Sequence, residues 1–140
     1  MSLQEEFAQR FSGLRLAYSV FTPTNEKRED GKAKGKNITI SKTLTKEEFL
    51  ELWQSHLDGT QSIGIVPIDE DSCCVWGAID VDEYPLDLKR LAKKIKKFSL
   101  PLVVCRSKSG GAHIYLFVFD PVPASTIQRK LRQVASAIGF

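Results

Sequence analysis

The sequence contains few of the residues that build disulfide frameworks and metal-binding modules. Its three cysteines include the adjacent pair Cys73 and Cys74 and form no Cys-x-x-Cys motif, and there are only two histidines among 140 residues. This set gives neither an even disulfide framework nor a zinc knuckle. Such cysteine usage is typical of a reducing compartment, and we expect a cytoplasmic protein.

Long apolar runs are missing as well. No stretch approaches the eighteen consecutive apolar residues of a membrane span, and the first six residues (MSLQEE) lack the cationic flank and apolar core of a signal peptide. Because no such apolar run is present, we expect no membrane partner. Internal repeats and low-complexity segments are also missing.

The composition that remains suits one globular domain with a real core. Hydrophobic residues make up 42% of the chain, and the net charge of +3 is mildly basic. That charge permits nucleic acid as a partner without requiring it. We predict a single α+β domain over residues 1–140, with an N-terminal α/β unit at residues 1–72 and a second part at residues 73–140.

In the N-terminal unit, apolar spacing predicts a helix over residues 3–11, then strands over residues 14–21 and 63–67. Between the strands, the composition of residues 22–37 changes to proline, asparagine, glycine and charged residues. They predict a mobile loop, which is either merely solvated or a flexible basic hook for a nucleic-acid backbone.

A second N-terminal helix is marked by its own start and stop signals. Thr45 and Glu48 form a capping box, which predicts a helix start at Thr45, and Gly59 ends the helix. His56 lies on its apolar stripe, where a packed structural histidine is more common than a ligand.

The second part is predicted to alternate strands and helices. Residues 73–81, 102–105 and 114–119 indicate strands, and apolar stripes at helical spacing indicate helices over residues 86–98 and 127–138. This order matches a ferredoxin-like or RNA-recognition-motif-like (RRM-like) layer of helices on a sheet, one element short of completion.

Three details of the strands are also predicted. The strands at residues 63–67 and 73–81 are expected to be antiparallel neighbours. The strands at residues 102–105 and 114–119 are apolar on both faces, which favours central positions in a covered sheet. Residues 121–123 (PVP) are expected to interrupt regular secondary structure between the last strand and the last helix.

Two carboxylates separated by a single residue stand where the strand over residues 73–81 ends. Asp80 and Asp82 share a face because side chains at i and i+2 of a strand point the same way, roughly 6.5–7 Å apart. Hard divalent cations favour carboxylate oxygens and take waters and phosphate oxygens as further ligands. Asp80 and Asp82 are therefore candidate ligands of Mg²⁺ or Mn²⁺; the alternative is that they end a strand and meet solvent.

A small, cationic, glycine-rich turn lies further along the chain. It consists of Arg106, Ser107, Lys108, Ser109, Gly110 and Gly111. Glycine lets the backbone amides approach phosphate oxygens without a Cβ obstacle, and the two cations supply countercharge. His113 begins the next strand, so its ring can point into the same cleft. An ordinary hairpin, with a strand histidine bonded to a neighbour, is the structural alternative.

The helix predicted over residues 86–98 separates an apolar face from a cationic one. The apolar face holds Leu88, Leu91, Ala92, Ile95 and Phe98. The outer face holds Lys89, Arg90, Lys93, Lys94, Lys96 and Lys97. Such a face is either solvated or follows a phosphate backbone, in which case Lys89, Arg90, Lys93, Lys94 and Lys97 are candidate nucleic-acid contacts.

These motifs, in this order, resemble the archaeo-eukaryotic primase superfamily. The nearer likeness is to the primase domain of TOTE conflict systems and of related phage and plasmid primases. It covers roughly residues 45–140 and includes residues 56–60 (HLDGT), 63–68 (IGIVPI), 76–82 (WGAIDVD) and 101–113 (PLVVCRSKSGGAH).

The resemblance implies a fold and a set of roles. The fold is archaeo-eukaryotic primase-like, with an incomplete RRM-like catalytic sheet covered by helices. Asp80, Asp82 and His113 would be catalytic, the aspartates as metal ligands and the histidine as a contact to the phosphates of the incoming nucleotide. Primases of this superfamily use a third carboxylate on a later strand, and the sequence reaches Phe140 where that strand would begin. We therefore expect a domain truncated before the third carboxylate, without full catalytic competence.

Three functional hypotheses remain. The first is the nucleotidyltransferase domain of a DNA primase or primase-polymerase, which joins nucleoside triphosphates on a single-stranded DNA template. Its parent would be a replication protein of a phage or other mobile element, with helicase or other replication modules. The second is a non-catalytic module that binds nucleotide or single-stranded nucleic acid. The third, based on the carboxylates alone, is a metal-dependent nuclease or phosphohydrolase.

Overall fold

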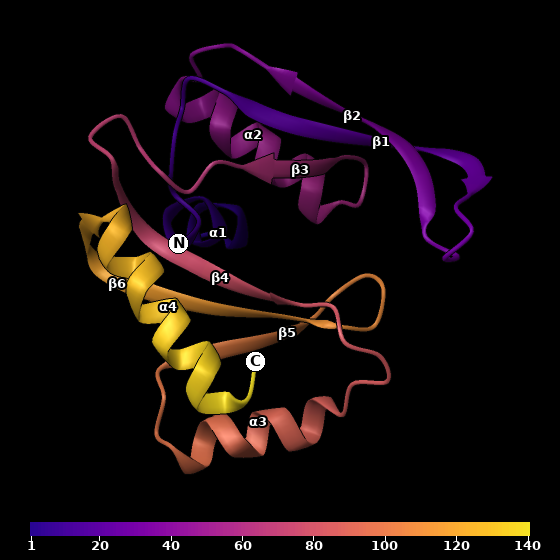
Figure 1. Ribbon diagram of the computed structural model, residues 1–140. Coiled ribbons are helices and arrows are strands. Elements are labelled where there is room, and N and C mark those ends of the chain that lie inside the picture. The colour runs from indigo at the N-terminus through magenta and orange to yellow at the C-terminus, as the bar shows by residue number, and fades with distance from the viewer. The chain divides into compact units, whose positions relative to one another are not determined.

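The computed structural model describes residues 1–140, which form two compact units, Met1–Asp71 and Ser72–Phe140. Each unit combines two helices with one antiparallel three-stranded sheet (Figure 1). The predicted α+β class is confirmed. None of the four helices combines the length and the apolar character that crossing a membrane requires.

The first unit is built around an aromatic core. Its elements are α1 (Leu3–Arg10), β1 (Tyr18–Lys27), β2 (Ala33–Ile40), α2 (Lys46–Leu57) and β3 (Ser62–Ile65), and the sheet has the order β2-β1-β3. Trp53 is buried at the centre, and its ring lies 5.5 Å from the rings of both Phe7 and Phe11. Burial of these rings stabilises the unit mainly through the hydrophobic effect.

The start of α2 agrees with its sequence signal. The Thr45 hydroxyl accepts a hydrogen bond from the Glu48 N–H at 3.1 Å. The capping box is only half formed, because the Glu48 carboxylate pairs with Lys42 instead. His56 packs edge-on against Trp53, and its Nδ1 lies 3.1 Å from the Gln61 carbonyl oxygen, which agrees with a structural role.

The prediction of a loop over residues 22–37 is wrong. β1 starts at Tyr18 rather than at residue 14 and continues to Lys27, and β2 begins at Ala33. The two strands form a long hairpin that is held by paired backbone groups and exposes most of its side chains. Most side chains on both faces of the hairpin are exposed to solvent. Its sequence therefore lacks the alternation of apolar and polar residues that marks a half-buried strand.

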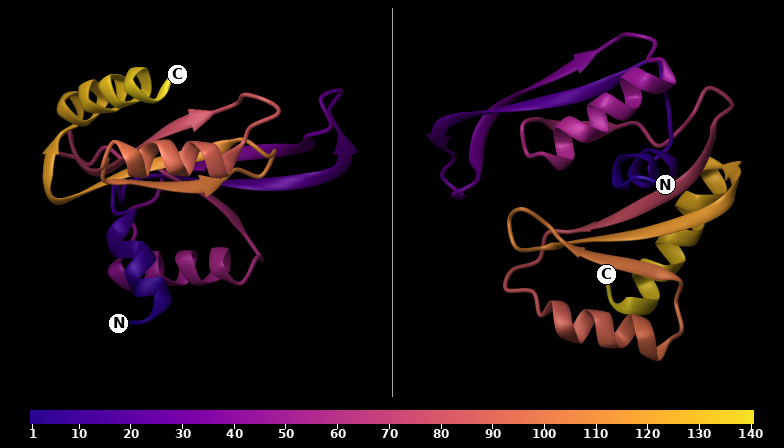
Figure 2. Two further views of the ribbon diagram at one scale, coloured as in Figure 1. Left: turned by 90° about the horizontal axis from the view of Figure 1, so that it is seen from below. Right: turned by 180° about the vertical axis from the view of Figure 1, so that it is seen from behind.

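The second unit has the predicted order of strand, helix, strand, strand, helix. Its elements are β4 (Cys73–Val81), α3 (Leu88–Lys97), β5 (Leu102–Arg106), β6 (Ala112–Pro123) and α4 (Ala124–Ile138). The sheet has the order β4-β6-β5. α4 runs along β4 and β6, and α3 lies beside β5 (Figure 2).

Both helices of the second unit cover the same face of its sheet. Val81 and Ile114 from the strands pack with Leu91 from α3 and Val134 from α4 in one buried cluster. Side chains of the opposite face therefore belong to the alternate positions of the strands, among them Asp80 and His113.

Several predicted details of these strands are wrong. β3 pairs with β1 and β4 pairs with β6, so β3 and β4 belong to different sheets. β6 has the predicted central position, but β5 is an edge strand, and its apolar residue Val103 is 49% exposed. β6 continues through the prolines, because Pro123 pairs with Cys73 beyond a register shift. Proline is tolerated at such irregular strand ends, where a ladder N–H is not needed.

Two residues assigned to the apolar face of α3 lie elsewhere. Ala92 is exposed, and Phe98 caps the C-terminus of the helix with half of its surface exposed. Leu91 and Ile95 are the buried residues of α3. The last helix behaves as predicted, because α4 buries Ile127 and Ile138 on its apolar stripe.

Candidate functional site

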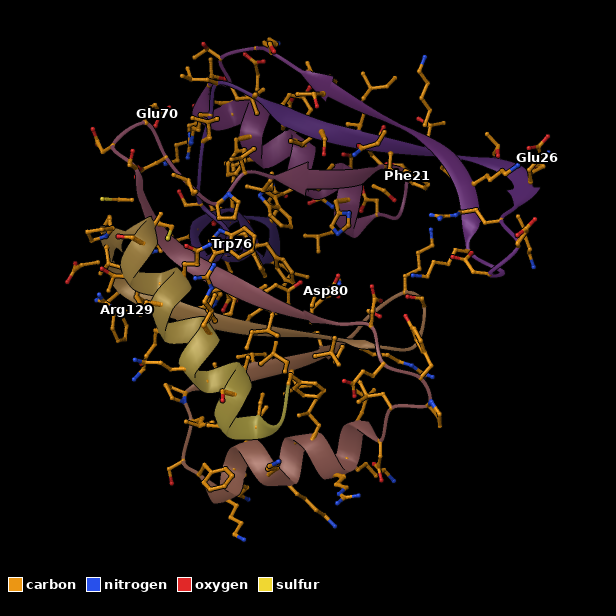
Figure 3. The ribbon with its side chains drawn as sticks, in the orientation of Figure 1. Phe21, Glu26, Glu70, Trp76, Asp80 and Arg129 are labelled. Atoms are coloured by element: carbon orange, nitrogen blue, oxygen red, sulfur yellow. The ribbon has the colours of Figure 1, made fainter.

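Asp80 and His113 lie directly opposite each other on the paired strands β4 and β6. The His113 Nε2 atom is 3.5 Å from the Asp80 Oδ1 atom, and both side chains are partly exposed. Figure 3 shows Asp80 projecting from β4 on the same side as Trp76, as the two-residue period of a strand requires. The sheet register therefore unites two residues that are far apart in the sequence.

The other ring nitrogen of His113 faces Tyr115. The Tyr115 hydroxyl lies 3.3 Å from Nδ1 of His113. Burial raises the pKa of Tyr115, and the nearby Cys105 and Asp80 side chains raise it further by electrostatic repulsion of the phenolate. The phenol therefore stays protonated at neutral pH, and its hydroxyl can share a hydrogen bond with the Nδ1 atom of His113.

Aromatic rings and a thiol surround this pair on the same face. The ring of Tyr115 lies 6.2 Å from that of Trp76 and 5.9 Å from that of Phe117. Cys105 of β5 is the register partner of His113. Sequence analysis missed Tyr115 and Cys105. Because side chains alternate along a strand, Tyr115 could have been predicted to share the face of His113. The position of Cys105 depends on the register between β5 and β6, which the sequence does not show.

The glycine-rich turn joins β5 to β6 and closes on itself. The Ser107 N–H donates to the Gly111 carbonyl at 3.0 Å, and the Gly110 N–H donates to the Ser107 carbonyl at 3.1 Å. Gly110 has φ +92°, a left-handed conformation that favours glycine. A Cβ on Gly111 would lie 2.1 Å from the Val81 carbonyl oxygen. The turn therefore packs against the end of β4, beside Asp82.

The side chains of the turn differ in exposure. Arg106, Lys108 and Ser109 are exposed. Ser107 is 9% exposed, and its buried hydroxyl has no hydrogen-bond partner. Buried polar groups are nearly always paired in native proteins, so this hydroxyl leaves an unused hydrogen-bonding capacity at the turn.

Tyr84 connects the two predicted motifs. Its hydroxyl lies 2.9 Å from the Asp82 Oδ1 atom and 2.8 Å from the Ser109 Oγ atom. Sequence analysis missed this role, because the hydrogen bond to Ser109 crosses 25 positions in the chain.

The donor set offers carboxylate oxygens from two residues. Asp80 is exposed beside His113, and Asp82 is exposed beside Tyr84. No group of three or more histidine, cysteine or acidic side chains gathers closely enough to hold a metal ion. Two exposed carboxylates fit a hard cation such as Mg²⁺ when waters and phosphate oxygens complete its coordination.

The cations predicted for α3 do not all have the same surroundings. The Lys94 ammonium donates to the Ile138 carbonyl oxygen at 2.9 Å and so caps the C-terminus of α4. Lys89, Arg90, Lys93 and Lys97 are exposed.

Comparison with known families assigns residues 4–138 to the TOTE conflict system, Archaeo-Eukaryotic Primase domain. The match covers nearly the whole chain, and the chain belongs to this family. No match was found among curated proteins. Domains of this type are primase-like and related to nucleotidyltransferases, which implies nucleotide and nucleic-acid substrates and divalent metal ions.

Proposed function

We propose that the second unit binds a nucleoside triphosphate together with Mg²⁺ or Mn²⁺ and transfers nucleotides onto a single-stranded DNA template, as a primase-polymerase does. The observation that carries this proposal is the register of β4 and β6, which sets Asp80 opposite His113. The same register brings the turn at residues 106–111 against the end of β4.

Asp80 and Asp82 are the proposed metal ligands. A divalent cation bound there supplies charge neutralisation to the phosphates and activation to the attacking hydroxyl. The aspartates contribute position and negative charge, and their exposure leaves room for phosphate oxygens.

The turn is the proposed phosphate-binding element. Arg106 offers a bidentate fork and Lys108 a point charge, while Gly110 and Gly111 allow close approach of the backbone. The unpartnered Ser107 hydroxyl supports this role, because a small opening of the turn would let it donate to a phosphate oxygen.

His113 is proposed to contact the triphosphate through Nε2. The hydroxyl of Tyr115 lies against Nδ1, so Nε2 is the ring nitrogen that can face a phosphate oxygen.

A second candidate function keeps nucleotide binding and omits the transfer. It is favoured by one observation, that no third acidic side chain joins Asp80 and Asp82. In either case we place the domain in a larger replication protein of a mobile element, with helicase or similar modules as partners.

Calorimetric titration of a nucleoside triphosphate with Mn²⁺ tests the proposal. We expect Asp80→Ala to weaken binding at least tenfold, equivalent to about 1.4 kcal/mol. Asp120→Ala, which removes an exposed acid elsewhere on β6, is the matched control and should bind like the wild type. Equal binding by wild type and Asp80→Ala would contradict the proposal.

Template-dependent extension separates the two candidates. Incorporation of labelled nucleotides opposite a single-stranded template, lost in Asp80→Ala, would support transfer. Metal-dependent binding without incorporation would support the binding module.

A further inference from the structure

α3 carries an unusual concentration of positive charge for a helix of ten residues. Its sequence LKRLAKKIKK contains six lysines and arginines and no acid. At 100° per residue, Lys89, Lys93, Lys96 and Lys97 fall within about a third of the circumference, opposite the buried Leu91 and Ile95.

None of these outward cations is neutralised within the protein. Lys89, Arg90, Lys93, Lys96 and Lys97 have no ion-pair partner among residues 1–140, whereas Lys94 binds the Ile138 carbonyl. Like charges three and four residues apart on a helix repel each other. A helix that only needs solubility avoids this cost with mixed charges, so the arrangement favours an external polyanion.

The charge is also unevenly divided between the two units. Residues 72–140 hold eleven lysines and arginines and five acids, whereas residues 1–71 hold nine and twelve. The net charge of +3 therefore conceals a strongly basic second unit. Charge complementarity points this unit toward a nucleic-acid backbone.

We propose that the outer face of α3 is a docking surface for the phosphate backbone of single-stranded DNA, separate from the site at Asp80. Ten residues of helix extend about 15 Å. One strand of a duplex rises ~3.4 Å per phosphate, so this length corresponds to about four phosphates of such a strand and to fewer of a more extended single strand. The inference rests on the proposed function only in taking the template as the natural ligand.

Fluorescence anisotropy of a labelled oligothymidylate tests this surface across a series of KCl concentrations, without nucleotide or divalent cation. The test variant of the full chain is Lys89→Gln/Lys93→Gln/Lys97→Gln. The matched control removes three exposed cations from α4, Arg129→Gln/Lys130→Gln/Arg132→Gln. Glutamine is a good helix former, so both helices should persist, and circular dichroism checks this.

We expect the slope of log Kobs against log[KCl] to fall in magnitude by about 2 in the α3 variant, because each lost phosphate contact removes about 0.7. The α4 variant should keep the slope of the wild type. If the α3 variant fails to fold, the single change Lys93→Gln decides, with an expected fall of about 0.7.

Three results would overturn the inference. They are an unchanged slope in the α3 variant, an equal fall in both variants, and binding through α3 to anionic phospholipid vesicles but not to the oligonucleotide. Calorimetry with nucleotide and Mn²⁺ distinguishes failure of this inference from failure of the proposed function. If the nucleotide site does not exist, the wild type will fail to bind nucleotide as well as the α3 variant.

Discussion

Tyr84 links the carboxylate of Asp82 and the hydroxyl of Ser109 through one phenolic oxygen. A hydrogen bond to a carboxylate restricts its rotation, and the contact to Ser109 holds the turn relative to that carboxylate. At the scale of single residues, Tyr84 is therefore the side chain that orients both proposed halves of the nucleotide site.

Replacing Tyr84 with phenylalanine keeps the ring and removes both hydrogen bonds. We expect affinity for nucleotide with Mn²⁺ to fall about tenfold, since a hydrogen bond to a charged group is worth about 1.5 kcal/mol. Calorimetry measures the change. Tyr18→Phe, the same substitution in the first unit, is the control, and an equal effect of both variants would contradict a positioning role for Tyr84.

The two carboxylates were predicted from spacing alone. Asp80 and Asp82 are two residues apart, so the period of a strand predicts that they share a face; β4 ends at Val81, and Asp82 follows it. The contacts of Tyr84 with Ser109 and of His113 with Asp80 depend on how the strands align, which local sequence does not specify.

At the scale of elements, the site depends on the fit between the turn and β4. Gly111 lies so close to Val81 that any larger residue must push the two strands apart. The pairing of Val81 with Ala112 is the first to be affected, and it is adjacent to Asp80 and His113.

Gly111→Ala tests this fit. Because overpacking costs about 1–3 kcal/mol, we expect the free energy of unfolding to fall by that amount and nucleotide binding to be lost with it. Denaturant titration and calorimetry measure the two effects. Gly59→Ala adds a methyl group in open space at φ +75°, so it should lower stability through backbone strain alone.

Nucleotide affinity distinguishes the two glycine variants. Gly59 belongs to the first unit, and its substitution should leave binding unchanged. If Gly111→Ala binds nucleotide as tightly as the wild type, the turn does not need its contact with β4.

Helices and buried strands of this chain were predictable because their apolar patterns repeat with a clear period. The starts of α2 and β4 agree with the sequence signals. The hairpin of β1 and β2 was not predictable, because its stability comes from backbone pairing rather than from a buried face. Strand neighbours were equally hidden, since β3 and β4 are consecutive in sequence yet belong to different sheets.

At the scale of the whole molecule, two compact units carry different features. The first unit holds the long hairpin and the aromatic core around Trp53, and the second holds Asp80, His113 and the cationic α3. The family relationship spans residues 4–138 and so includes both units. Sequence motifs indicated the family from the second unit mainly, because the chemically distinctive residues are concentrated there.

The central claim is that metal ion and nucleotide share one site between β4 and the turn. The most direct test is the ¹⁵N–¹H spectrum of the full chain with nucleoside triphosphate and a substoichiometric amount of Mn²⁺, which broadens nearby amide signals. We predict broadening at residues 80–84 and 107–113, and its loss in Asp80→Ala. Broadening centred instead on the acidic residues 69–71, with the turn unaffected, would contradict the claim.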